Sequence, residues 1–264
     1  MHRIASLPGE ESTPNNLEII EQPKAPVLFL TSANTDISTV ASFLKLKKKP
    51  VLKDKLRALS LNSLQHASQI DHYLSTSCEA ASIIIVRLLG GKNHWQYGLE
   101  ELTKWKAKKK SRILIVLSGT KENEDELNEL SSISPEITIK LGELLRVGGL
   151  ENVETFFSYI NILLEKGYNN FIKTKLEVSY LTDPYKYQWK DEDFPKVGLI
   201  FYLSTYQADD LDYINKIIDI FRKNRLSPKC IFVSTLKNSS VQQEVIKTYK
   251  DNNISAIVCC TSFS

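Results

Sequence analysis

Short apolar runs that suit buried strands alternate along this chain with segments of helical period. In its first part, the runs expected to form strands are Pro26–Ser32, Leu56–Ser60, Ile83–Val86 and Arg112–Ser118. The segments expected to form helices lie between them, at 34–46, 62–77 and 97–109. Strands that alternate with helices are typical of βαβ units, so the sequence predicts a parallel sheet.

The pattern changes and then returns. Two consecutive helices are expected at 136–146 and 152–166, and residues 167–195 carry Pro184, Pro195 and no clear period. A second α/β series follows. Its expected strands are 196–204, 229–234 and 255–260, and its expected helices are 209–224 and 239–252.

The predicted fold class is therefore α/β, with two Rossmann-like or flavodoxin-like parallel-sheet units. The expected domains are an N-terminal α/β domain with trailing helices over 1–166, a connector over 167–195 and a partial second α/β domain over 196–264. A parallel sheet normally has helices on both faces, and the sequence supplies no helix after its last expected strand. We therefore expect the second unit to be incomplete at its C-terminus.

The stretch SIIIVRLLGGKNHWQYG, Ser82 to Gly98, holds the candidate site. An arginine is costly to bury unpaired, so Arg87 should lie near a strand end, and Gly90-Gly91 should form the turn that follows. Such turns bind ligands in open α/β sheets. The candidate ligand-binding or partner-binding residues are Arg87, Gly90, Gly91, Lys92, His94, Trp95 and Tyr97. The structural alternative is that Arg87 pairs with an acidic neighbour, the glycines only make the turn, and the aromatic residues pack at a helix start.

Composition and motifs exclude several functions. The net charge of +3 does not suggest nucleic-acid binding, and the lysine runs at 47–49 and 104–110 suit solvated loops or helix ends. The sequence has no GxxxxGK[ST] loop, so we do not expect this chain to hydrolyse ATP. It also shows no apolar run of membrane-spanning length and no signal-peptide pattern, which favours the cytoplasm.

Metal binding and metal insertion by these residues are not expected either. The four cysteines form no CxxC pair. His66 and His72 are six residues apart on one expected helix, and at about 100° per residue they fall on different faces. We see no cluster of carboxylates and histidines that could both take up pyrrole protons and hold a metal.

The segment from Leu56 to Leu102 resembles the N-terminal region of the cobaltochelatase large subunit, of the CobN type, which is related to the H subunit of magnesium chelatase. The residues that carry the resemblance are Leu64, His66, Asp71, Tyr73, Val86 to Gly91, Trp95, Tyr97 and Gly98. The blocks Met1–Gly9 and Gly148–Ile160 are also similar to family blocks. The chain departs from the family at Ser204–Asp210, where a glycine-asparagine pair is often found, and in its last six residues, CCTSFS.

The resemblance implies a portion of a large subunit that binds a corrin-type or porphyrin-type ring during ATP-dependent metal insertion, a ligase reaction that forms nitrogen–metal bonds. It implies AAA+ ATPase partner subunits, a tetrapyrrole substrate, and cobalt or magnesium used by the full complex, with no cofactor bound by this chain. The first hypothesis is cobalt insertion in cobalamin biosynthesis, with this chain inactive alone. The alternatives are a magnesium chelatase H-subunit fragment of chlorophyll biosynthesis and a free-standing, non-enzymatic α/β binding module.

Overall fold

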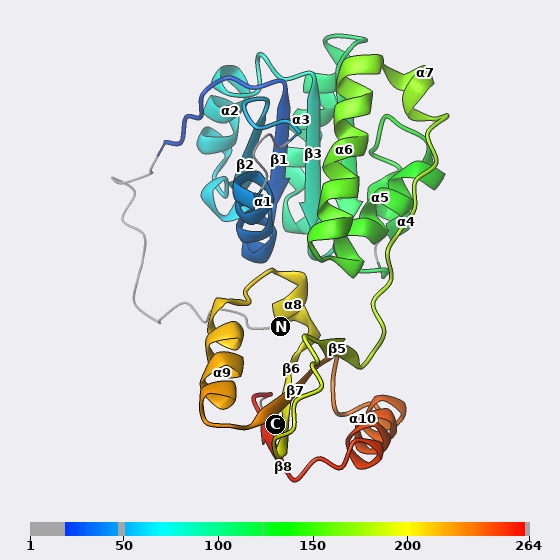
Figure 1. Ribbon diagram of the computed structural model, residues 1–264. Coiled ribbons are helices and arrows are strands. Elements are labelled where there is room, and N and C mark those ends of the chain that lie inside the picture. Colours follow the sequence, from blue (N-terminus) through cyan, green and yellow to red (C-terminus); the bar gives the residue numbers. More distant parts are fainter. Residues whose placement is uncertain (1–18, 47–50, 123, 262–264) are drawn as a thin grey trace.

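The structure is a computed structural model that describes residues 19–46, 51–122 and 124–261. The lysine run at 47–49, the block Met1–Gly9 and the last three residues lie outside the described part. Two α/β units follow one another along the chain, and the second is the smaller (Figure 1). The predicted fold class is confirmed. The division of the chain at 166 and 196 stays a prediction.

The first unit is built on a four-stranded parallel sheet. Its strands are β1 (Val27–Thr31), β2 (Leu56–Ser60), β3 (Ile83–Leu88) and β4 (Ile113–Ser118), in the order β2-β1-β3-β4. This is the flavodoxin-like order. The runs of Val, Ile and Leu in β1, β3 and β4 are almost completely buried, because helices cover both faces of the sheet.

Each face of this sheet has its own helices. One face packs against α1 (Asn34–Leu46), α5 (Pro135–Val147) and α6 (Leu150–Lys166), and the other packs against α2 (Ala67–Thr76) and α3 (Gln96–Ala107). The short α4 (Glu124–Asn128) follows β4, and α7 (Tyr168–Phe171) follows α6. Figure 1 shows α1 and α6 in front of the strands.

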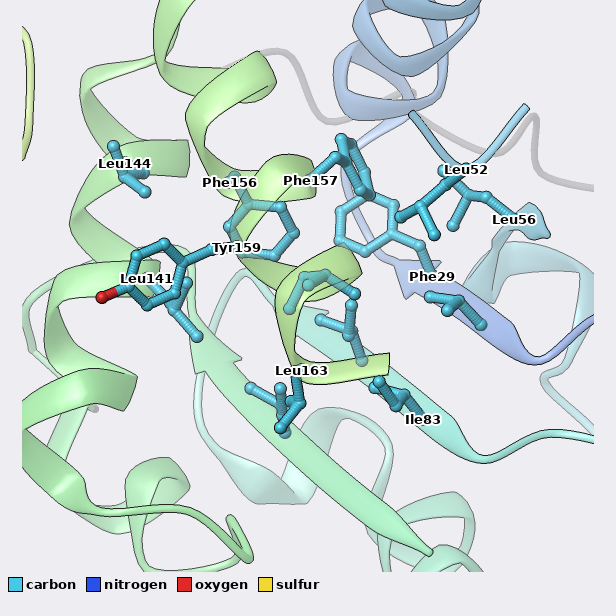
Figure 2. Packing of buried hydrophobic residues seen from close by; sticks show 14 of the residues in the cluster. Phe29, Leu52, Leu56, Ile83, Leu141, Leu144, Phe156, Phe157, Tyr159 and Leu163 are labelled. Atoms are coloured by element: carbon cyan, nitrogen blue, oxygen red, sulfur yellow. The ribbon is translucent and has the colours of Figure 1, made fainter. Parts of the chain in front are cut away.

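Aromatic rings fill the core under α1 and α6 (Figure 2). The centroids of Phe156 and Phe157 lie 5.1 Å apart with the rings edge to face, and Phe157 stacks on Phe43 at 5.4 Å. Phe29 of β1 meets Phe157 at 5.9 Å. Side chains from a strand and both helices thus fix how α6 lies on the sheet, which in turn places the α5–α6 loop at the carboxyl edge of β1 and β3.

The second sheet is mixed. Its strands are β5 (Tyr185–Tyr187), β6 (Lys196–Tyr202), β7 (Ser227–Val233) and β8 (Ala256–Cys259), in the order β5-β7-β6-β8. β6, β7 and β8 are parallel, as predicted, but β5 runs antiparallel to β7. The helices of this unit are α8 (Leu203–Gln207), α9 (Asp212–Lys223) and α10 (Ser239–Asp251). α9 packs on one face of this sheet and α10 on the other.

Most expected boundaries are shifted, and three of the shifts have clear local reasons. The helix expected from Asn62 begins at Ala67, because residues 61–63 form a 3₁₀ turn and His66 caps the helix with Gln69. The strand expected to reach Ser204 ends at Tyr202, because α8 begins at Leu203. β7 begins two residues earlier than expected, because it already pairs with β6 at Ser227, and Pro228 is tolerated near the start of a strand.

Candidate functional site

The carboxyl ends of β1 and β3 form the point where the chain connections diverge. From β1 the chain crosses to β2 on one side, and from β3 it crosses to β4 on the other. A crevice opens at such a switch point, and ligands of open α/β sheets bind there. The predicted turn lies at this edge. The structure divides the predicted site residues between the two faces of the sheet.

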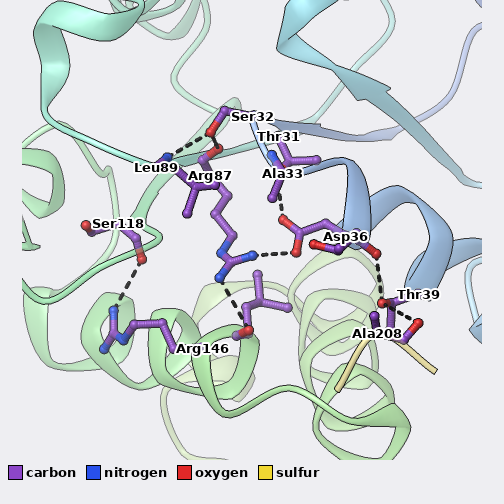
Figure 3. A network of polar contacts seen from close by, with 12 residues as sticks. Thr31, Ser32, Ala33, Asp36, Thr39, Arg87, Leu89, Ser118, Arg146 and Ala208 are labelled. Carbon is purple, nitrogen blue, oxygen red and sulfur yellow. Dashed lines mark hydrogen bonds and ion pairs between the residues drawn. The ribbon is translucent and has the colours of Figure 1, made fainter. Parts of the chain in front are cut away.

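Arg87 lies on the face covered by α1 and α5. Its guanidinium forms an ion pair with the carboxylate of Asp36, in the first turn of α1, and also donates to the carbonyl of Leu145 at 3.4 Å (Figure 3). The Thr31 hydroxyl donates to the other Asp36 oxygen at 2.5 Å. The Arg87 and Asp36 side chains are only 8% and 13% exposed. Arg87 thus has the acidic neighbour that the structural alternative requires.

The two units meet beside this ion pair. The Thr39 hydroxyl lies 3.4 Å from the carbonyl oxygen of Ala208, just after α8, and the Gly149 amide donates to Gln207 at 3.2 Å. The Gln207 side-chain amide donates to the Val147 carbonyl at 2.5 Å. A cavity of about 150 Å³ remains between α1, the α5–α6 loop and α8, and it is smaller than ordinary ligand pockets.

A second buried ion pair lies close to the first. Arg146, at the end of α5, pairs with Glu124 of α4 at 2.6 Å and donates to the carbonyl of Ser118 at 3.3 Å. Both side chains are less than a fifth exposed. The sequence reasoning missed Asp36, Glu124 and Arg146 as members of this network. Asp36 carried one available signal, because it stands in the first turn of a helix that follows a buried strand.

The turn after β3 depends on one of its two glycines. Gly90 has φ +117°, and a Cβ built there would lie 2.6 Å from Cε1 of the His94 ring. Gly91 has φ −76°, so its backbone conformation is open to any residue. The Leu89 amide donates to the Ser32 hydroxyl at 2.7 Å, which ties the turn to the end of β1. The backbone here is thus held against both β1 and His94.

A larger cavity lies on the opposite face of the sheet, beside α2 and α3. Its volume is about 510 Å³, within the range of small-molecule sites. Aromatic, imidazole and amide side chains line it, among them Asn62, Gln65, Asn93, His94, Trp95, Gln96 and Tyr97. The structure thus brings His94, Trp95 and Tyr97 together, with Gly90 under the His94 ring, while Arg87 faces the other cavity.

The aromatic residues of this cavity have polar partners. The Trp95 indole donates to the carbonyl of Leu64 at 2.8 Å, and the Tyr97 hydroxyl donates to Asp71 at 2.8 Å. The hydrogen bond to the Asp71 carboxylate raises the pKa of Tyr97 to about 12, so this phenol keeps its proton at an alkaline pH where a free tyrosine would ionise. Lys92 lines neither cavity and pairs with Glu126 at 3.2 Å. The Lys92 side chain is 53% exposed.

The described residues contain no group of three or more His, Cys, Asp or Glu side chains that could hold a metal ion. His66 caps α2, and His72 pairs with Glu21 at 2.7 Å. Burial raises the pKa of the Cys78 and Cys230 thiols to about 12, so neither is a ready nucleophile at neutral pH. Among the described helices, none has both the length and the apolar character needed to cross a bilayer.

Fold and site define an α/β protein with a ligand-sized cavity at the carboxyl edge of a parallel sheet. Residues 143–264 match the family model described as CobN/Magnesium Chelatase. The whole chain aligns with the aerobic cobaltochelatase subunit CobN of Pseudomonas aeruginosa at 24% identity, and 90% of it aligns with CobN of a Sinorhizobium species at 25%. The predicted resemblance to the CobN/magnesium chelatase family is confirmed.

These relatives are much longer than this chain. The alignments span 22% of the Pseudomonas protein and 20% of the Sinorhizobium protein. Among solved structures, the catalytic subunit of cobaltochelatase from Mycobacterium tuberculosis matches 90% of this chain with a TM-score of 0.63 and 16% identity, over 18% of its own length. At that identity the match supports the fold, and the fold agrees with the two α/β units described above.

Proposed function

We propose that this chain is the N-terminal portion of a CobN-type large subunit, which binds the tetrapyrrole of an ATP-dependent cobaltochelatase in the cytoplasm. The observation that carries the proposal is the alignment of the whole chain with CobN. Cobalt and the ring are the substrates, and AAA+ partner subunits hydrolyse ATP. We do not expect this portion to insert the metal alone, because the described residues offer no metal-holding cluster.

The cavity beside α2 and α3 is the proposed contact with the ring. Its 510 Å³ suits one peripheral arm of a tetrapyrrole. The amide side chains of Asn62, Gln65 and Asn93 and the imidazole N–H of His94 can donate hydrogen bonds to a carboxylate on that arm. Tyr97 is 38% exposed at the rim and can pack against the ring itself.

The remaining candidates take supporting roles in this proposal. Gly90 lets the turn pass under the His94 ring, and Gly91 begins the 3₁₀ turn that leads to it. Lys92, the most exposed cation of the turn, can meet a second ring carboxylate or a partner subunit. Arg87 acts through Asp36 by fixing β3 against α1, so it positions the turn rather than meeting the ligand.

A titration of the purified chain with a carboxylated corrin precursor tests this proposal. We expect saturable binding, weakened about fivefold or more by Asn93→Ala or His94→Ala, since one hydrogen bond contributes about 1 kcal/mol. His72→Ala is the matched control, because His72 pairs with Glu21 away from the cavity. Equal binding by all variants, or no binding at all, would refute the proposed contact.

Two measurements separate the alternatives. Tighter binding of a magnesium-free porphyrin than of the corrin precursor would favour a magnesium chelatase H-subunit fragment. Failure to bind either ring, together with failure to associate with AAA+ chelatase subunits, would favour the non-enzymatic binding module. Metal insertion by the purified chain with ATP, ring and metal but no other subunit would contradict the view that it is inactive alone.

A further inference from the structure

The second sheet repeats three strands of the first. β7-β6-β8 follows the same order and direction as β2-β1-β3, with β6 in the place of β1 and β8 in the place of β3. In the first sheet the outer edge of β3 pairs with β4. In the part of the chain that the structure describes, no strand pairs with the outer edge of β8.

The side chains of β8 are apolar although they are exposed. All six residues of β3 are buried, whereas Ile257 and Val258 in the middle of β8 are 55% and 41% exposed. Ile246 on the neighbouring α10 is 47% exposed. Ile257 faces α10 together with Ile246, whereas Val258, the next residue of the strand, points to the face that α9 covers. Exposed apolar side chains beside a free strand edge indicate an interaction surface.

A groove runs between α10 and β8. Two cavities, of about 570 and 400 Å³, lie along it, and Val245, Ile246 and Ile257 line both. The larger cavity also reaches Thr261, which follows β8. Ile257 therefore lines a hollow of the surface, although more than half of it is exposed.

The first unit shows what kind of element fits such a groove. There, the chain leaves β3, forms α3 beside α2 on the same face of the sheet, and returns as β4 parallel to β3. Parallel crossovers are right-handed almost without exception. A crossover from β8 to an outer strand therefore places its helix on the face that α10 covers, over Ile246 and Ile257.

We infer that the groove between α10 and β8, with the free edge of β8, is the seat of one helix-and-strand segment that corresponds to α3 and β4. The occupant is the polypeptide that follows the matched region in the longer CobN relatives. Those relatives are about five times the length of the matched region, and a crossover from β8 starts beside Thr261, where the groove begins. This inference rests on sheet topology and stands apart from the proposed ring contact.

The test joins this chain, after Ser264, to the segment of about 60 residues that follows the matched region in the Pseudomonas aeruginosa CobN. Hydrogen exchange of β8 is compared with and without the added segment, alongside thermal unfolding and sedimentation. We expect slower exchange of the β8 amides in the fusion. We also expect Ile246→Lys and Ile257→Lys to leave the 264-residue chain unchanged and to lower the melting temperature of the fusion.

The matched control is Ile220→Lys. Ile220 lies on α9, and its exposed fraction of 57% is similar to the 55% of Ile257. Ile220 lines neither cavity of the groove. It should leave both proteins unchanged. Unchanged exchange of β8 in the fusion would overturn the inference, as would equal effects of Ile257→Lys with and without the segment. If the 264-residue chain forms a dimer and Ile257→Lys dissociates it, the occupant of the groove is a second copy of this chain, and the inference is overturned.

Discussion

Arg87 near the end of β3 and Asp36 in the first turn of α1 form an ion pair that is almost fully removed from solvent. Removal of one member leaves the other charge buried and unpaired, which typically costs about 3–5 kcal/mol. We therefore expect Arg87→Met or Asp36→Leu alone to lower the free energy of unfolding by about 3 kcal/mol in urea titrations. The double variant should lose less than the sum of the two.

Lys92→Met is the control for this pair. Its partner Glu126 and Lys92 itself are both more than a third exposed, so the loss should be within about 1 kcal/mol. Should Arg87→Met keep full stability and weaken ring binding, the positioning role of Arg87 would be wrong and direct ligand contact would be favoured.

Gly90 and Gly91 offer a second test. Gly90→Ala places a Cβ against the His94 ring at a positive φ, so we expect a loss of about 1–3 kcal/mol. Gly91→Ala should change stability by less than about 1 kcal/mol, because the φ of Gly91 is ordinary. The double variant Gly90→Ala/His94→Ala removes the clash but keeps the backbone strain. We therefore expect it to regain part of the stability that Gly90→Ala loses. Equal melting temperatures for the two single variants would contradict this account.

The junction of the two units depends on Gly148. Gly148 has φ +67°, and a Cβ there would lie 3.0 Å from Cβ of Gln207 in α8. Gly167 has φ +75°, and no atom lies within 4 Å of a Cβ built there. Gly167→Ala therefore measures the effect of backbone strain without a close contact. We expect both variants to lose stability, but only Gly148→Ala should speed hydrogen exchange of the Gly149 amide, which donates to Gln207. Equal exchange in both would show that the close approach does not hold the junction.

Two buried thiols predict how stability depends on alkaline pH. The pKa of Cys78 and of Cys230 is raised by burial from 9 to about 12 in the folded chain. Between these values the unfolded chain gives up the thiol protons first and binds fewer protons, so stability falls as the pH rises. Each thiol contributes at most about 1.4 kcal/mol per pH unit. We expect the free energy of unfolding to fall less steeply between pH 9 and 10 in Cys78→Ala/Cys230→Ala than in the unaltered chain. An equal slope in both proteins would contradict the raised pKa of the two thiols.

Local patterns were enough to predict most of the fold. The bounds of β2 and α1 agree with the expected ones, and every other expected strand and helix is present with shifted ends. α4, α7 and α8 were not predicted, because helices of four or five residues show too little of the helical period. β5 has three residues and is fixed by pairing with β7, so nothing in its own sequence distinguishes it from a loop.

The candidate site was predicted as one turn, and the structure shows why that was incomplete. Successive residues of a strand point to opposite faces, so Arg87 lies with Ile83 and Ile85 while Leu88 lies toward the cavity with His94 and Trp95. This separation can be read from the strand period. The pairing of Arg87 with Asp36 depends on the register of β1 against β3 and the placement of α1, which are tertiary properties.

β5 has a consequence for any recombinant version of the second unit. It covers Cys230 to Phe232 of β7 by antiparallel pairing, and Trp189 just after it donates to the Cys230 carbonyl at 2.6 Å. A protein that begins at Lys196 would therefore expose the backbone of β7 on one side while β8 stays open on the other. Such a two-edged sheet can add strands from neighbouring molecules in both directions, which is the geometry of filament growth. Starting the protein before Leu181 would close one of these directions.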